Sequence, residues 1–138
     1  AAVAVPRYLD SIANAEKSAE DAVLSAIKAG LKQYANNSLL ENGRASWPEN
    51  PFDALSEKPA GYTEDGDLAD TDGEWTFIPI NTADGTGGEI THQRADNSRF
   101  TWYYDSGTQE DDKYNYNPLG DQTAIGNPLG PRTAVGNE

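Results

Sequence analysis

The fold is decided by the stretch LDSIANAEKSAEDAVLSAIKAGLKQYAN, residues 9–36, which contains no proline and one glycine. Its apolar and small residues recur at spacings of three and four, so they lie along one stripe of a helix with about 3.6 residues per turn. The stripe consists of Leu9, Ile12, Ala19, Val23, Ala26, Ile27, Gly30, Leu31 and Tyr34. The pattern predicts a long amphipathic helix over residues 1–37, which ends near Asn36-Asn37-Ser38 because asparagine tolerates the left-handed conformation that often terminates helices.

Small residues are unusually frequent in this helix. They are Ala13, Ala15, Ala19, Ala22, Ala26, Ala29 and Gly30. The alanines keep the helix propensity high and leave the helix narrow. Neighbouring elements can therefore approach its axis closely.

Residues 38–74 have the composition of a connecting loop. Asn42-Gly43 is a turn signal, and three prolines interrupt any regular element before residue 60. Four apolar or aromatic side chains within this loop are expected to anchor it to the core: Trp47, Phe52, Leu55 and Tyr62.

Three β-type runs follow in residues 75–105, which predicts an antiparallel meander. The runs are residues 75–80, 89–94 and 99–105, joined by the glycine-rich residues 81–88 and by residues 95–98. Phe100, Trp102 and Tyr104 share one face of the third strand and are expected to pack on the helix. Pro79 donates no backbone hydrogen bond, so we expect it at a strand end, an edge or a bulge.

The order of the expected elements indicates one α+β domain, in which the long N-terminal helix packs on a small antiparallel sheet and an irregular C-terminal arm follows. The 138 residues are 36% hydrophobic, enough for a modest core. The formal net charge of −13 disfavours nucleic acid as a partner, because that partner requires clustered lysine and arginine. The chain has no cysteine, so it holds neither a disulfide nor a thiolate site.

The acidic loop at residues 64–74 is the candidate cation site. Calcium takes six to eight oxygen ligands, often from carboxylates clustered on a turning backbone. The candidate ligands are Asp65, Asp67, Asp70 and Asp72. Leu68 stands where an EF-hand loop would have its first ligand, so the loop is not an EF-hand. A calcium site and a simply solvated acidic loop both remain open; no cofactor is required.

The C-terminal region, residues 106–138, contains a tandem repeat. The sequence NPLGDQTAIG at residues 117–126 returns as NPLGPRTAVG at residues 127–136. Each unit combines a turn with a short β-type run, which suits a brief strand or an extended arm, whereas a solenoid needs three or more repeats. The arm either packs over its own subunit or a neighbour, or is a free terminus.

No pattern of catalytic residues emerges, and we expect no enzyme activity. The single histidine, His92, has no cysteine or second histidine with which to build a zinc site, and it is interpreted as structural. The chain also lacks the Gly-x-Ser-x-Gly elbow of many serine hydrolases.

The first eleven residues, AAVAVPRYLDS, lead directly into the long helix. This arrangement resembles the type IV pilin and type II secretion pseudopilin family. In that family the mature chain begins with a methylated phenylalanine and continues through an apolar stretch that ends in a sequence like residues 1–8. Because the chain starts inside an apolar run and contains no methionine, we expect it to be the soluble remainder of a longer polypeptide.

The resemblance implies a structural subunit of a helical filament, either a type IV pilus or a type II secretion pseudopilus. Its partners would be copies of itself and other pilins. The apolar segment would anchor it in the inner membrane before assembly, and the filament would lie in the periplasm or at the bacterial cell surface. The expected assembly face on the helix comprises Leu9, Ile12, Ala19, Val23 and Ala26.

A function of another class is a surface binding module for a carbohydrate or a protein. In this alternative, Trp75, Trp102, Tyr103 or Tyr104 would form an exposed aromatic platform. Burial of these rings distinguishes the two hypotheses, because a platform needs several rings that face outward.

Overall fold

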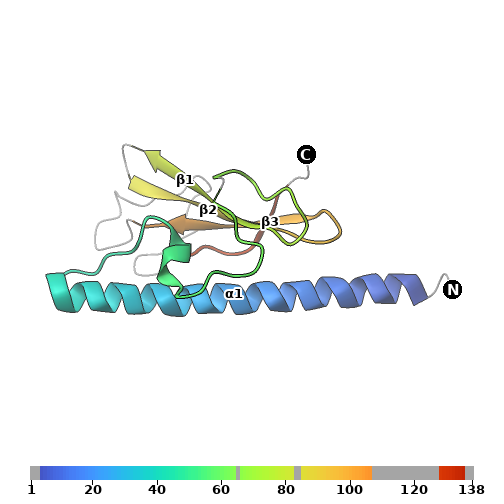
Figure 1. The fold of residues 1–138 in the computed structure, drawn as a ribbon, viewed down its shortest axis with the longest axis horizontal. Helices are drawn as coiled ribbons and strands as arrows, with labels where there is room; N and C mark the ends of the chain where they lie inside the picture. Colours follow the sequence, from blue (N-terminus) through green and yellow to red (C-terminus); the bar gives the residue numbers. More distant parts are fainter. Residues whose placement is uncertain (1–3, 65, 83–84, 107–127, 136–138) are drawn as a thin grey trace.

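A single long helix lies along one face of a four-stranded antiparallel sheet (Figure 1). The computed structural model describes residues 4–64, 66–82, 85–106 and 128–135. The elements are α1 (Ala4–Asn42), the 3-10 helix η1 (Pro51–Ala54), β1 (Trp75–Thr82), β2 (Gly85–Gln93), β3 (Arg99–Asp105) and β4 (Thr133–Val135). The predicted α+β class, with a long N-terminal helix and a small antiparallel sheet, is confirmed.

Helix α1 is longer than predicted, because it continues through Asn36-Asn37-Ser38 to Asn42. Ser38 is buried, and its hydroxyl donates a hydrogen bond of 2.8 Å to the carbonyl oxygen of Arg44. The helix ends at Gly43, which has a φ of 74° and donates its N–H to the carbonyl oxygen of Leu39. The stop predicted near residue 37 was wrong, since the left-handed residue that ends the helix is the glycine of the Asn42-Gly43 turn.

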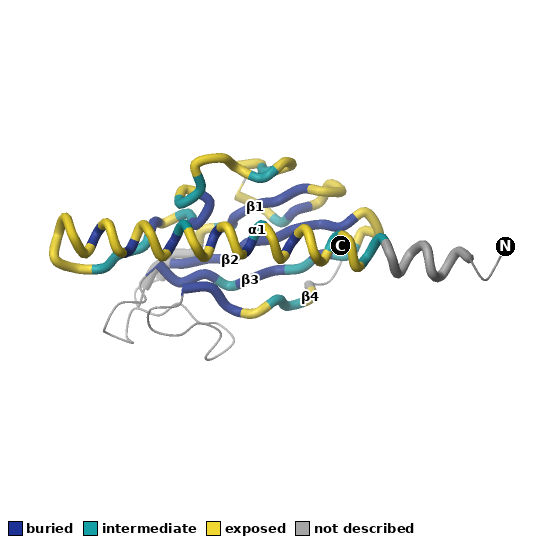
Figure 2. The backbone as a smooth tube through the Cα atoms, turned by 90° about the horizontal axis from the view of Figure 1, so that it is seen from below, coloured by how far each residue is buried: buried dark blue, intermediate teal, exposed yellow. Residues whose placement is uncertain are grey.

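The buried stripe of α1 is rotated relative to the predicted one. The buried residues are Glu20, Leu24, Ile27, Leu31, Ala35 and Ser38. Ile27 and Leu31 were predicted, but Tyr34 is 42% exposed, and Ala19 and Ala26 are also exposed. The prediction went wrong because alanine was counted as apolar, which drew the stripe toward the alanine-rich side of the helix. Figure 2 shows buried and exposed positions alternating along α1.

The sheet has the order β1-β2-β3-β4, with every neighbouring pair antiparallel. The β1–β2 hairpin extends into residues 81–88, which the sequence had suggested were only a connection. Gly88 pairs with Pro79, and a Cβ on Gly88 would collide with the carbonyl oxygen of Ile78 and the ring of Phe77. Glycine therefore allows close packing at this point in the strand. As predicted, Pro79 lies on an edge strand, where proline is tolerated.

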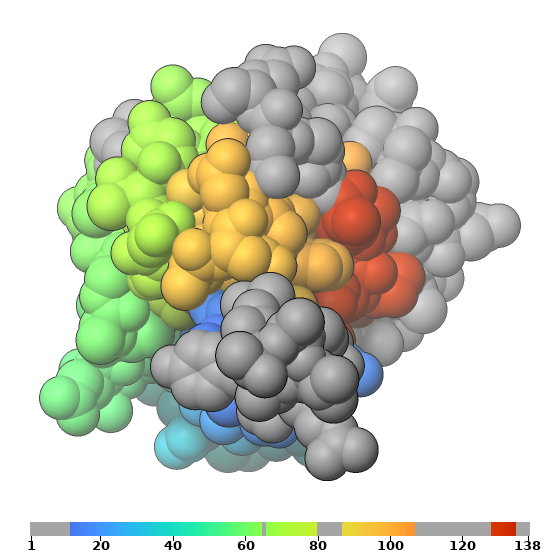
Figure 3. Space-filling view, turned by 90° about the vertical axis from the view of Figure 1, so that its right-hand side faces the viewer, coloured from blue at the N-terminus to red at the C-terminus, as the bar shows by residue number. Residues whose placement is uncertain are grey.

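The second copy of the tandem repeat contributes β4, which pairs with β3 and packs beside it (Figure 3). Leu129 of this copy is 4% exposed and belongs to the main hydrophobic cluster. The arm thus packs over its own subunit in residues 128–135. The first copy, residues 117–126, lies outside the described residues.

The core fills the space between α1 and the sheet with aromatic rings from β1 and β3 and aliphatic side chains from the helix. Trp75 and Trp102 stack with ring centroids 5.7 Å apart, and Tyr104 is fully buried. The four predicted loop anchors are confirmed: Phe52 is buried, while Trp47, Leu55 and Tyr62 are partly buried against the cluster. Among the described residues, neither α1 nor η1 contains an apolar stretch long enough to span a membrane.

Candidate functional site

The side of α1 turned away from the sheet is exposed and carries no charge between residues 15 and 40. We call it the outer face, and it consists of Ala15, Ala19, Ala22, Ala26, Ala29, Gln33, Asn37 and Leu40. All eight are exposed, and successive members are separated by three or four residues, so they form one continuous row. Five of the eight are alanine. Another helix can therefore approach the α1 backbone closely, because side-chain size at the contact sets the distance between packed helices.

Such a face is unusual for a helix in contact only with water, which normally carries charged residues there. The chain is 24% charged, and α1 carries its charges elsewhere, on its flanks or on its buried side. Leu40 is 84% exposed at the end of the row. An uncharged row of small residues avoids the desolvation cost that a helix–helix contact would otherwise impose on ionised side chains.

The structure brings only part of the predicted assembly face onto the outer face. Ala19 and Ala26 lie on it, whereas Ile12 and Val23 are half-buried beside it, and Val23 packs against the core. Leu9 lies within α1, but its side chain is outside the described residues. Ala15, Ala22 and Ala29 complete the row. Sequence reasoning noted their small size, and their spacing of seven residues could have shown that they share a face.

A buried ionic cluster joins α1 to the sheet. Glu20 is fully buried; its carboxylate accepts hydrogen bonds of 3.0 and 2.7 Å from Arg94 and lies 2.5 Å from Nδ1 of His92. Arg132, which precedes β4, donates to Glu20 and to Asp21 over 3.2 and 2.7 Å. The cluster therefore links the helix, β2 with the turn that follows it, and the C-terminal segment.

Aromatic rings surround this cluster. His92 stacks on Trp75 with ring centroids 4.2 Å apart, Arg94 lies 4.0 Å over the ring of Phe100, and Arg132 lies 5.3 Å from that of Trp102. Burial alone would raise the pKa of Glu20, but the hydrogen bonds and charges of Arg94 and His92 outweigh it and lower this pKa to about 2. His92 thus contacts both Glu20 and Trp75, which is compatible with its predicted structural role.

The acidic loop is organised by Glu74, which was not among the predicted ligands. Its buried carboxylate accepts hydrogen bonds from the N–H groups of Asp70 and Thr71 and from the hydroxyl of Thr63. Burial opposes ionisation here too, but these donors lower the pKa of Glu74 below its ordinary value. The carboxylate of Glu74 thus stabilises the conformation of the loop through these hydrogen bonds.

The predicted calcium ligands do not converge in the part of the loop that the structure describes. Asp67, Asp70 and Asp72 are exposed, and Asp65 lies outside the described residues. Among the described residues, no group of three or more acidic or histidine side chains is placed to hold a metal ion. The calcium site stays a prediction.

The calcium site can be tested by thermal unfolding. A rise in melting temperature on addition of calcium, which is lost in the variant Asp70→Asn, would support it.

The aromatic platform of the alternative hypothesis is mostly internal. Trp75 and Trp102 are each 4% exposed, Tyr104 is completely buried, and Tyr103 is half-buried. Three of the four rings therefore contribute to the core and cannot stack outward against a ligand.

Comparison of the chain with protein-family models, with curated proteins and with solved structures finds no match.

Proposed function

We propose that this protein is a structural subunit of a helical filament of the type IV pilus or type II secretion pseudopilus kind, which assembles through α1. The observation that carries the proposal is the outer face, an exposed row that remains uncharged and mostly alanine over residues 15–40 of a chain with a net charge of −13. The resemblance of residues 1–11 to the pilin family supports it.

The shape of the molecule suits this role. The N-terminal end of α1 extends past the end of the sheet (Figure 1). The sheet and residues 128–135 lie on one side of the helix (Figure 1), and the residues of the outer face are exposed. In a filament, the helices would pack centrally and the sheets would form the outside.

The assembly mechanism follows from the asymmetry of the subunit. A contact between different surfaces of successive copies does not close on itself, and it generates an open helical polymer. In the proposed cycle, an apolar extension of α1 holds the subunit in the inner membrane before assembly. It then joins the filament core at the cell surface or in the periplasm.

The test is to place a charge on the outer face of the full-length protein in the cells that produce it. We expect Ala22→Glu and Ala26→Glu to reduce the amount of sheared filament at least tenfold, because each buries an unpaired carboxylate in the assembled contact. Both positions are exposed in the subunit, so its melting temperature should change little. Filaments are measured by immunoblot of the sheared fraction and by electron microscopy.

Ala60→Glu is the matched control, since it adds the same charge at an exposed position in the loop outside the helix. It should leave the filament yield unchanged. The proposal is wrong if the chain is found in no filament, or if the two helix variants assemble as well as the control.

A further inference from the structure

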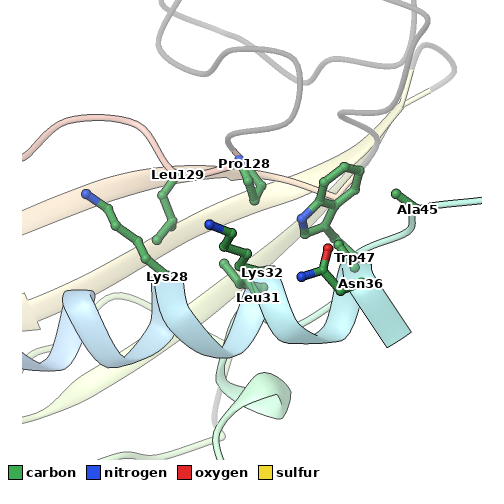
Figure 4. Close-up of a pocket in the computed structure, with 9 residues that line it drawn as sticks. Lys28, Leu31, Lys32, Asn36, Ala45, Trp47, Pro128 and Leu129 are labelled. Atoms are coloured by element: carbon green, nitrogen blue, oxygen red, sulfur yellow. The ribbon is translucent and has the colours of Figure 1, made fainter. Parts of the chain in front are cut away.

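A cavity of about 530 Å³ opens between α1 and the C-terminal segment, and neither the fold nor the proposed assembly uses it. Figure 4 shows its lining: Lys28, Leu31, Lys32, Ala35, Asn36, Ala45, Trp47, Pro128 and Leu129. These residues come from α1, from the loop directly after it and from residues 128–129, which are distant from both in the sequence. The volume lies within the range of small-molecule sites in proteins.

The floor of the cavity is apolar and rigidly held. Leu31 and Leu129 are 1% and 4% exposed and belong to the main core, and Ala35 and Pro128 are also buried. The half-buried ring of Trp47 stands at one end (Figure 4). An aromatic wall beside an aliphatic floor favours a flat apolar group, which can stack on the ring while it covers the leucines.

The rim of the cavity is cationic. Lys28 and Lys32 are one helical turn apart, and their side chains rise from α1 on the same side as Asn36 (Figure 4). Neither ammonium group has an ion-pair partner within residues 4–64, 66–82, 85–106 and 128–135. Like charges at this helical spacing repel each other, and an anion between them would remove that repulsion.

This local charge is opposite to that of the rest of the molecule. The chain has a net charge of −13, and a second cavity, near Tyr62, is lined by Glu49, Asp53 and Glu64. In contrast, the described residues that line the cavity at Trp47 include two lysines and no acidic residue. Because salt screens charges beyond about 8–10 Å, the two lysines at the rim act on a bound group more strongly than distant acidic residues do.

We propose that this cavity binds a small organic anion with a flat apolar body, such as an aromatic carboxylate. The apolar body lies on Leu31 and Leu129 against the ring of Trp47. The anionic group lies at the rim, where Lys28 and Lys32 donate to it and the amide of Asn36 supplies a further hydrogen bond. This site is on the flank of α1, so binding to the isolated chain does not depend on filament formation.

The test uses the whole chain, labelled with ¹⁵N, and naphthalene-2-carboxylate as the probe. Trp47→Phe identifies the indole N–H resonance of Trp47 among those of the three tryptophans. We expect the probe to shift this resonance with a dissociation constant on the order of 1 mM or lower. The uncharged naphthalene-2-carboxamide should bind at least threefold more weakly than the carboxylate. Because salt screens the attraction between the lysines and the carboxylate, the difference in affinity between the two probes should become smaller at about 300 mM salt.

Exposed lysines can be replaced without loss of folding, so the variants test the charges directly. Lys28→Gln and Lys32→Gln should each weaken binding of the carboxylate about two- to fivefold and leave binding of the carboxamide unchanged. Lys17→Gln is the matched control on the same helix, because Lys17 is exposed but does not line the cavity, and it should have no effect.

Ala45→Phe, which fills the cavity from its rim and keeps both lysines, should abolish binding of both probes. The proposal is overturned if the Trp47 resonance does not shift at millimolar probe, or if the carboxamide binds as well as the carboxylate. It is also overturned if Lys17→Gln weakens binding as much as the two cavity variants do.

Discussion

At the scale of single residues, Glu20 makes the contact between helix and sheet specific. Its carboxylate is fully buried and is hydrogen-bonded to Arg94, His92 and Arg132 at the same time. Paired buried charges contribute little net stability relative to an apolar core, but the loss of one partner leaves the others uncompensated. Removal of Glu20 should therefore cost much more than its own hydrogen bonds contribute.

We predict that Glu20→Gln lowers the free energy of unfolding by about 3 kcal/mol at neutral pH. The pKa of Glu20 is about 2 in the folded chain and 4.5 ordinarily, so its ionised form is stabilised by folding. That stabilisation is complete above about pH 4.5 and is lost as the pH falls toward 2. Urea denaturation of both proteins across this range should show the difference between them shrinking as the pH falls.

Asp21→Asn is the control for this experiment. The side chain of Asp21 is 58% exposed, and it pairs with Arg132 at the surface, where an ion pair contributes less than about 1 kcal/mol. If Asp21→Asn destabilises the chain as much as Glu20→Gln does, burial of the cluster is not the cause.

The role of Glu20 could not be predicted from the sequence. An acidic residue between Ala19 and Asp21 on an alanine-rich helix is typical of a solvated face, and its partners lie 72 and 74 positions further along the chain. His92 could be predicted to be structural because a lone histidine builds no metal site, but its partner could not.

At the scale of elements, α1 and the 3-10 helix η1 approach each other closely at Gly30. A Cβ on Gly30 would lie 2.5 Å from the carbonyl oxygen of Ala54, so this contact requires glycine. The glycine therefore lets the connecting loop cross the helix.

We predict that Gly30→Ala lowers the free energy of unfolding by about 1–3 kcal/mol, although alanine is the better helix former. The clash forces the helix and the loop apart, and thermal or urea unfolding measures the cost. The control is the opposite substitution, Ala29→Gly, at the neighbouring exposed position. It should lower the free energy of unfolding by only about 1 kcal/mol, because glycine has a lower helix propensity than alanine. A gain in stability in Gly30→Ala would contradict the close contact.

The C-terminal segment is also part of the core, and Leu129→Ala tests this. We predict a loss of about 2–4 kcal/mol in the free energy of unfolding, because Leu129 is 4% exposed and its removal leaves a cavity. Leu40→Ala, at a position that is 84% exposed, should change it by less than about 0.5 kcal/mol. Equal effects in the two variants would show that the segment does not pack on the core.

Elements were predictable where periodicity was strong and independent of distant contacts. The alternation in residues 99–105 predicted β3, and the three-and-four spacing predicted α1. The C-terminal end of α1 was predicted wrongly because Ser38 forms hydrogen bonds with Arg44 and Ser46 only when the following loop folds back on the helix. The face that α1 buries includes Leu24 and Ala35, which the predicted stripe did not contain. Alanine is compatible with either a core or an exposed face, so its positions did not distinguish the two.

At the scale of the whole molecule, charge is distributed unevenly, and each proposal uses a different part of that distribution. The outer face of α1 is uncharged, the cavity at Trp47 has a cationic rim, and acidic residues surround the cavity near Tyr62. The class of fold was readable from the order of helix, loop and strands. The cavity was not, because Lys28, Trp47 and Leu129 become neighbours only in the folded chain.

The pairing of β4 with β3 has a consequence for the tandem repeat. The runs Thr123-Ala124-Ile125 and Thr133-Ala134-Val135 have nearly the same sequence, so their intrinsic strand propensity is nearly the same. At the position before this run the copies differ, with Gln122 in one and Arg132 in the other. Only the guanidinium can neutralise the carboxylates of Glu20 and Asp21. Arg132 therefore joins the second copy to α1 through ion pairs that the uncharged amide of Gln122 cannot form.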